Sequence, residues 1–64
     1  MIVNGKQVEL AQPMSLADFL LQSDYRLDLV AVELDGAIVK SSEYPRIQLE
    51  PNSTLEVVSF VGGG

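Results

Sequence analysis

The sequence predicts a small α+β domain in which a mixed sheet of four to five strands packs on one helix. Two dipeptides, Asn4-Gly5 and Asp35-Gly36, are hairpin signals, because both residues of such a pair tolerate the positive φ of a type I′ turn. Between them lies a stretch whose apolar residues have helical spacing, and a β-rich run precedes the C-terminus. A chain of 64 residues is long enough for one domain with one core.

The first predicted hairpin joins two short extended runs, residues 1–4 and 7–11. In the second run Val8 and Leu10 alternate with polar residues, which gives this strand one apolar face and one solvated face. We therefore expect both side chains to lie in the core.

A helix is predicted over about residues 16–23. A proline ends the preceding strand, and Ser15 followed by Asp18 resembles a capping box with Asp in place of Glu or Gln. Just beyond the helix, Asp24 and Asp28 are interpreted as two solvated carboxylates and not as an acid/base pair. The apolar stripe of this helix consists of Leu16, Phe19 and Leu20.

The second predicted hairpin pairs residues 29–34 with residues 37–39, because the first of these runs is rich in residues that favour strands. Residues 41–44 are expected to form one helical turn. Ile47 and Leu49 are expected to supply a short buried segment at the edge of the sheet.

The last predicted strand covers residues 55–61 and runs directly into three glycines. One helix must cover one face of the sheet, since no other layer exists to bury it. The first and last strands are expected to lie side by side and parallel in the centre, with the helix in a right-handed crossover. This order is that of the ubiquitin-like β-grasp. The folded domain would span residues 1–61, followed by a flexible C-terminal glycine tail at residues 62–64.

The composition argues against catalysis by this chain alone. It contains no Cys and no His, which removes thiol nucleophiles and the commonest metal ligand. A chain this short needs nearly all of its large apolar side chains for the core, which leaves little room for a substrate pocket. We therefore expect no enzyme, no metal site and no bound cofactor.

The charge of the chain indicates which partners it suits. The net charge is −5, from nine acidic and four basic residues. No basic stripe exists, so nucleic acid and anionic membranes are poor partners, and a basic protein surface is a better one. The apolar runs are too short to span a bilayer. A strand-like pattern begins at Met1 without the features of a signal peptide, so we expect a cytoplasmic protein.

Two stretches carry a resemblance to a known family. Residues 30–39, VAVELDGAIV, resemble the VAVxLNGxIV hairpin of the ubiquitin-like sulfur carriers, and residues 42–44, SEY, are similar to the segment that follows it. The chain also ends as these carriers do, on Gly62, Gly63 and Gly64. Over essentially its whole length it resembles the small sulfur carriers of thiamine (thiazole) biosynthesis, the ThiS family.

The resemblance implies a reaction cycle centred on Gly64. An ATP-dependent adenylating enzyme, related to ubiquitin-activating enzymes, would convert the C-terminal carboxylate into an acyl-adenylate. Sulfur from a cysteine-derived persulfide, held by a donor such as a cysteine desulfurase, would displace AMP and leave a thiocarboxylate. Thiazole synthase would accept that sulfur. Gly62 and Gly63, which lack Cβ atoms, would let the tail thread a narrow channel in each partner.

Alternation along the last predicted strand assigns its two faces. Leu55 and Val57 share one face, whereas Glu56, Val58 and Phe60 share the other. Glu56 should face solvent, so Val58 and Phe60 are expected to be exposed as well. We interpret these two apolar residues as a contact patch for partner proteins.

Two other functions remain open from the sequence. A sulfur carrier like the small subunit of molybdopterin synthase would have the same fold, although such chains are usually longer. A ubiquitin-like protein modifier joined to lysines, or an interaction module that never activates its tail, would also fit. A modifier forms isopeptide-linked adducts on other proteins, whereas a carrier returns with a free carboxylate after each turnover.

Overall fold

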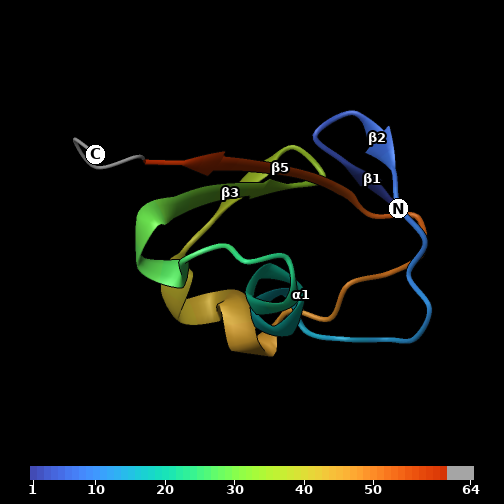
Figure 1. The fold of residues 1–64 in the computed structure, drawn as a ribbon, viewed down its shortest axis with the longest axis horizontal. Coiled ribbons are helices and arrows are strands. Elements are labelled where there is room, and N and C mark those ends of the chain that lie inside the picture. Colours follow the sequence, from blue (N-terminus) through green and yellow to red (C-terminus); the bar gives the residue numbers. More distant parts are fainter. Residues whose placement is uncertain (61–64) are drawn as a thin grey trace.

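The computed structural model describes residues 1–60 and shows a sheet with helical segments on one side (Figure 1). The five strands lie in the order β2-β1-β5-β3-β4. Their neighbours are antiparallel except for β1 and β5, which are parallel. This is the mixed sheet and the β-grasp order that the sequence predicts. The strands are β1 (Ile2–Val3), β2 (Lys6–Gln7), β3 (Val30–Leu34), β4 (Ala37–Val39) and β5 (Thr54–Ser59).

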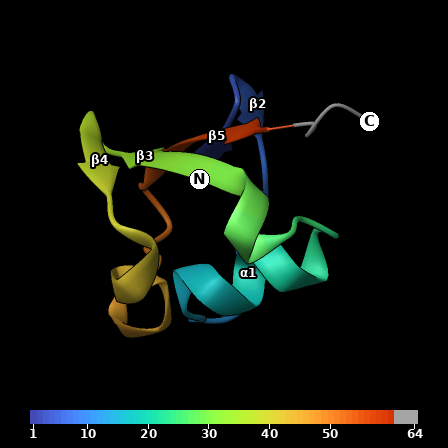
Figure 2. The same cartoon turned by 90° about the vertical axis from the view of Figure 1, so that its left-hand side faces the viewer.

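The helical layer contains the α-helix α1 (Leu16–Gln22) and the 3-10 segments η1 (Leu27–Leu29) and η2 (Ser41–Arg46). Figures 1 and 2 show these segments on the same side of the sheet. No helix in residues 1–60 covers the opposite side, which we call the outer face. Within the same residues, no helix is both long and apolar enough to cross a membrane. The helical turn expected at residues 41–44 exists and extends two residues further, to Arg46.

Hydrogen bonds close both ends of α1. At the N-terminal end, Ser15 Oγ accepts a hydrogen bond from the Asp18 backbone N–H at 3.0 Å, as the capping pattern predicts. At the C-terminal end, the Tyr25 N–H donates to the Leu20 carbonyl at 2.9 Å. Asp24, between them in the chain, has a φ of 65°. This is a Schellman end with Asp where Gly is usual, and the helix stops one residue before the predicted end.

Both predicted hairpin turns are confirmed. Asn4 and Gly5 have φ values of 50° and 82°, and Asp35 and Gly36 have φ values of 50° and 87°. These are the left-handed values that a type I′ turn requires at its two central positions. The predicted parallel pairing of the first and last strands is also confirmed, with Ile2–Val3 alongside the start of β5.

The second strand differs from its prediction. The expected strand covered residues 7–11, but β2 covers only Lys6–Gln7. Its ladder with the first strand continues through two more hydrogen bonds and then ends: the Val8 N–H donates to the Met1 carbonyl at 2.8 Å, and the Met1 ammonium donates to the Val8 carbonyl at 3.1 Å. The chain leaves the sheet at this point to reach the start of α1. The expected length was wrong because it was inferred from the alternation of apolar and polar side chains. A strand also needs a neighbouring backbone to pair with, and the first strand offers none beyond Met1.

The last strand begins one residue earlier than predicted, at Thr54, and is followed by Phe60. Residue 61, the predicted end of the strand and of the domain, lies outside the described residues together with residues 62–64. The segment expected at the sheet edge around Ile47 and Leu49 contributes an isolated bridge between Ser15 and Gln48. Within residues 1–60 this segment forms no strand, although Leu49 is buried as expected.

The core fills the space between the sheet and the helical layer. Leu16 and Leu20 of α1 are fully buried, and Phe19 packs against the core while partly buried. Val8 and Leu10, which were expected in the core, lie at its margin and are also partly buried. The buried apolar residues are Met1, Leu16, Ala17, Leu20, Val30, Val32, Tyr44, Leu49, Leu55 and Val57.

Candidate functional site

The outer face of β3, β4 and β5 carries the residues that the sequence marks as a contact patch. Val58 lies opposite Ala31, and Glu33 lies opposite both Glu56 and Ile38. Because side chains alternate along a strand, these residues point away from the helical layer. We define the outer-face patch as Ala31, Glu33, Ile38, Glu56, Val58 and Phe60.

The large apolar side chains of the outer-face patch are open to solvent. Val58 is 59% exposed and Phe60 is 55% exposed, which confirms the predicted face assignment of the last strand. That partner proteins contact these two residues stays a prediction. Ile38 is 75% exposed and joins the patch, although it was not among the residues predicted to contact partners. The two-residue turn pairs it with Glu33, so the register of the hairpin was the signal that could have found it.

Two carboxylates lie in the middle of the outer-face patch. Glu33 and Glu56 are directly opposite each other on β3 and β5, where cross-strand Cβ atoms are usually about 5 Å apart. Like charges in this arrangement repel, and a cation between them would remove the repulsion. A shallow hollow of about 220 Å³ opens here, and its lining contains no Lys or Arg. The hollow is lined by Ala31, Val32, Glu33, Ile38, Glu56 and Val58.

The outer-face patch leads directly toward the C-terminal residues. β5 is hydrogen-bonded to β1 on one side and to β3 on the other, so its position is fixed from both edges. The Phe60 N–H donates to the Leu29 carbonyl at 2.7 Å, which continues this pairing one residue past the strand. The predicted tail residues Gly62, Gly63 and Gly64 follow, and they lie outside the described residues.

The ionisable groups with a displaced pKa lie away from the outer-face patch. The Arg26 guanidinium donates two hydrogen bonds to the Asp28 carboxylate, at 3.2 and 2.9 Å, and lowers the pKa of that carboxyl below its usual value. Burial raises the pKa of the Tyr44 phenol. Within residues 1–60, no group of three or more His, Cys, Asp or Glu side chains is placed to hold a metal ion. The described part of the site therefore consists of exposed apolar side chains around two carboxylates.

Sequence comparison gives one family and several relatives. The model of the ThiS family matches residues 1–64. The ycf40 protein of Pyropia yezoensis is 32% identical over 62 residues, which cover 97% of this chain and 87% of that protein. A thiazole synthase from Paramagnetospirillum magneticum is 30% identical over 64 residues. That match covers all of this chain but only 20% of the synthase.

Structural comparison gives the same fold. The crystal structure of a thiamine biosynthesis protein (ThiS) from Geobacter metallireducens superposes with a TM-score of 0.77 and covers 98% of this chain and 96% of that one. A solution structure of a thiamine biosynthesis protein from the same organism gives a TM-score of 0.79. Both are 24% identical to this chain. At that identity the likeness establishes the β-grasp fold.

Proposed function

The chain belongs to the ThiS family, and on that basis we propose that it is a sulfur carrier of thiamine biosynthesis. The observation that carries the proposal is the match of that family to all of residues 1–64, which end on Gly62, Gly63 and Gly64. In this proposal the Gly64 carboxylate is the only reacting group of the chain. The chain carries sulfur, and its partner enzymes supply the catalysis.

The proposed chemistry begins at the terminal carboxylate. A carboxylate is a poor electrophile, so one of its oxygens first attacks the α-phosphorus of ATP and releases pyrophosphate. A persulfide on the sulfur donor attacks the resulting acyl-adenylate, AMP leaves, and an acyl disulfide joins Gly64 to the donor. A second thiol then attacks the donor's sulfur in this disulfide. It forms a new disulfide with the donor and releases the thiocarboxylate on Gly64. Thiazole synthase accepts this sulfur, and the carboxylate is restored by hydrolysis of the acyl group.

Glycine suits the tail because each partner must enclose a reactive acyl group and exclude water. A folded domain cannot enter such a site. Gly62, Gly63 and Gly64 have no Cβ atoms, and three extended residues reach about 10 Å. The tail would thread a narrow channel while the folded domain stays outside. Ordering glycines has a high entropic cost, so contacts with the folded domain must offset it.

We assign those contacts to the outer-face patch. Phe60 and Val58 lie two and four residues before the tail, and Ile38 widens the apolar area on the neighbouring strands. The opposed carboxylates of Glu33 and Glu56 favour a partner that inserts a Lys or Arg between them. The proposed partners are the adenylating enzyme and thiazole synthase. The thiazole synthase of Paramagnetospirillum magneticum supports the second, because a segment similar to this chain makes up a fifth of that polypeptide.

Family membership favours this function over the other two candidates. A carrier of the molybdopterin-synthase type shares the fold, but the matched family model is ThiS. A protein modifier would use the same activated carboxylate to form an isopeptide bond with a lysine. The thiamine-pathway carrier is therefore the function that we propose.

Mass spectrometry of the intact chain tests the proposed chemistry. After incubation with the adenylating enzyme, ATP and a persulfide donor, one oxygen should be replaced by sulfur at Gly64. A chain without Gly64 should keep its fold and gain no sulfur. Sulfur on an internal residue, or a stable isopeptide adduct on another protein, would contradict the proposal.

Binding measurements test the role of the outer-face patch. Phe60→Ala should weaken binding to the adenylating enzyme or to thiazole synthase by about tenfold or more, because a central aromatic is a typical hot spot. Leu21→Ala is the matched control, since Leu21 is 56% exposed and lies on α1, away from the outer face. Both variants should unfold at nearly the same temperature as the parent chain. Equal affinity of the Phe60→Ala and Leu21→Ala variants for the partner would mean that Phe60 does not contact it.

A further inference from the structure

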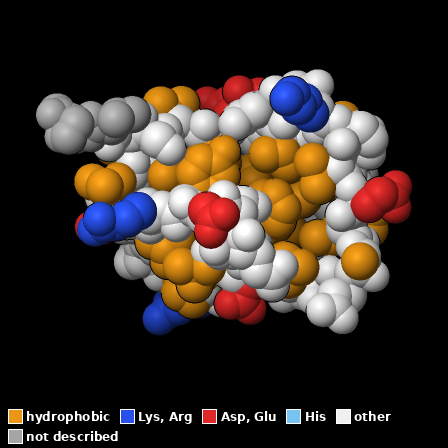
Figure 3. Space-filling model, viewed as in Figure 1, with side chains coloured by type: hydrophobic (Ala, Val, Ile, Leu, Met, Phe, Trp, Pro, Cys, Tyr) orange, Lys and Arg blue, Asp and Glu red, His pale blue; other side chains and the backbone are white. Residues whose placement is uncertain are grey.

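A second open surface lies on the helical side of the sheet, between the β1–β2 hairpin and the C-terminal end of α1. We call it the hairpin–helix groove, and its volume is about 380 Å³. Figure 3 shows apolar side chains gathered in this region. The groove shares no residue with the outer-face patch. Its lining consists of Val3, Asn4, Lys6, Val8, Phe19, Ser23 and Tyr25.

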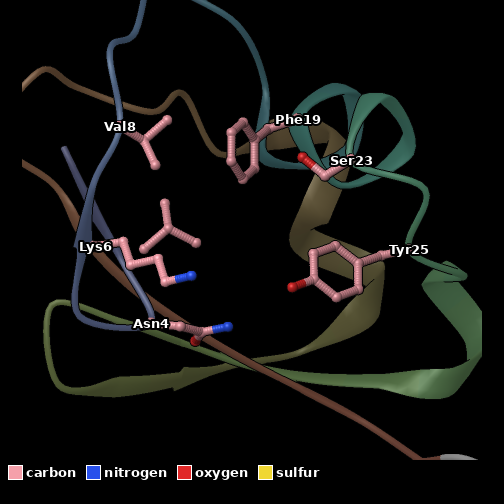
Figure 4. A pocket seen from close by; sticks show the side chains of 7 residues that line it. Asn4, Lys6, Val8, Phe19, Ser23 and Tyr25 are labelled. Atoms are coloured by element: carbon pink, nitrogen blue, oxygen red, sulfur yellow. The ribbon is translucent and has the colours of Figure 1, made fainter.

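The groove combines an apolar floor with polar groups that point into it. Val3, Val8 and Phe19 pack against the core and remain partly accessible. Figure 4 shows the Lys6 ammonium and the Tyr25 hydroxyl directed into the space between the hairpin and the helix. Among residues 1–60, neither side chain has a hydrogen-bond or ion-pair partner.

The charge of the groove differs from that of the whole chain. Lys6 is the one charged residue among the lining residues of the described structure. The chain as a whole carries a net charge of −5. A ligand with many carboxylates would therefore be repelled by the rest of the surface, whereas a single carboxylate beside Lys6 would be attracted.

The groove also borders a free strand edge. β2 is the outermost strand on this side of the sheet. Its ladder uses the Val8 N–H and carbonyl, which bond to Met1 at 2.8 and 3.1 Å. Gln7 lies opposite Ile2, whose N–H is directed to Ser53 on the other side. Alternation of the ladder therefore directs the N–H and carbonyl of Gln7 outward, where another strand can pair with them.

We propose that the hairpin–helix groove binds an extended segment of a partner protein, which adds as a strand beside β2. Apolar side chains at alternate positions of the segment would contact Val8 and Phe19, and one carboxylate would pair with Lys6. An extended segment uses both features of this surface, since its backbone pairs with Gln7 while its side chains fill the groove. A small molecule in the groove would leave the strand edge unused.

This site is independent of the proposed sulfur chemistry. The groove faces the helical layer, whereas the outer-face patch lies on the other side of the sheet. A protein bound in the groove would therefore leave the patch accessible to a second protein. A partner bound in the groove would keep the chain in a complex while its C-terminal end binds an enzyme.

An NMR titration tests the proposal with a defined probe. The probe is an acetylated and amidated peptide of about eight residues, with valine at alternate positions and one central aspartate in place of a valine. We expect saturable shifts of the backbone amides of Gln7, Val8 and Ser23, and little change at Val58. Largest shifts at Val58, or no saturation with peptide in the millimolar range, would overturn the proposal.

Charge variants separate the proposed contact from general electrostatics. Lys6→Glu should weaken binding of the aspartate peptide by about fivefold or more, and replacing the peptide aspartate by lysine should restore it. Lys40→Glu changes the net charge equally at an exposed site outside the groove and should leave binding unchanged. Gln7→Pro removes the outward N–H and should also weaken binding. Equal effects of Lys6→Glu and Lys40→Glu on peptide binding would overturn the proposal. This comparison of the two charge variants holds even if Gln7→Pro fails to fold.

Discussion

The two β-hairpins have the same type of turn, yet the side chains at the first turn position bond differently. Asn4 and Asp35 both have a φ of 50°, and each is followed by a glycine. Both side chains reach the central strand β5, but they bond to different edges of it. Together the two turns fix the position of the strand that leads to the C-terminal residues.

The Asn4 side chain takes the place of a neighbouring strand. β1 ends at Val3, and beyond it the Asn4 amide bonds to the backbone of Val57. The Asn4 Oδ1 accepts from the Val57 N–H at 2.8 Å, and the Asn4 Nδ2 donates to the Val57 carbonyl at 3.3 Å. A single amide thus satisfies two backbone groups that β1 is too short to reach.

The Asp35 side chain holds the start of β5 from the opposite edge. Its Oδ1 accepts from the Thr54 N–H at 2.8 Å, and its backbone N–H donates to the Thr54 carbonyl at 2.8 Å. The side-chain bond is exposed to solvent, whereas the bonds of Asn4 are partly buried. Because a bond shielded from water is costlier to lose, Asn4 should contribute more to stability than Asp35.

The largest expected effect is that of Asn4→Gly. Glycine accepts the positive φ, so the turn is preserved, but Val57 loses both bonds to the side chain. We expect the free energy of unfolding to fall by about 1–2 kcal/mol, measured by urea denaturation. Amide exchange at Val57 should become faster. An unchanged midpoint would mean that the side chain acts only through the turn conformation.

Asp24→Gly should have a smaller effect of opposite sign. Asp24 is the third described non-glycine residue with positive φ, but its side chain bonds to no other described residue. Glycine removes the conformational cost without removing a bond, and it suits the Schellman end of α1. We expect a gain of about 0.5–1 kcal/mol in the same denaturation experiment. Asp24→Ala is the control and should give no gain, since alanine disfavours this conformation as well.

Asp35→Gly should change stability least. The exposed bond to Thr54 is worth about 0.5–1 kcal/mol, and relief of the positive φ offsets a similar amount. We therefore expect a net change within about 0.5 kcal/mol. A loss of unfolding free energy as large as that of Asn4→Gly would show that the Asn4 and Asp35 side chains contribute equally to stability.

The double variant measures whether the two turns act independently on β5. Val57 and Thr54 lie three residues apart, or roughly 10 Å along an extended strand, and bond on opposite edges. The effects of Asn4→Gly and Asp35→Gly should therefore add to within about 0.5 kcal/mol. A larger coupling energy would indicate that loss of one turn lets the strand shift against the other.

The sequence alone determined the features that depend on local chemistry. The Asn4-Gly5 and Asp35-Gly36 turns follow from residues that tolerate positive φ. The start of α1 follows from Ser15, whose hydroxyl bonds within its own turn. The exposure of Val58 and Phe60 follows from the period of two along a strand, once Glu56 is placed in water.

The tertiary structure decided what joins distant parts of the chain. No local pattern shows that the amide of Asn4 bonds to Val57 or that pairing beyond β2 stops after Val8. Nor does one show that β3 pairs with β5, which brings Ile38 near the last strand. The hairpin–helix groove likewise needs Lys6 and Tyr25 brought to the same opening. Turns and caps are stabilised by residues a few positions apart in the chain, so short stretches of sequence predict them. The length of a strand and the residues that share a surface depend on which distant segment packs beside them, and only the folded structure brings those segments together.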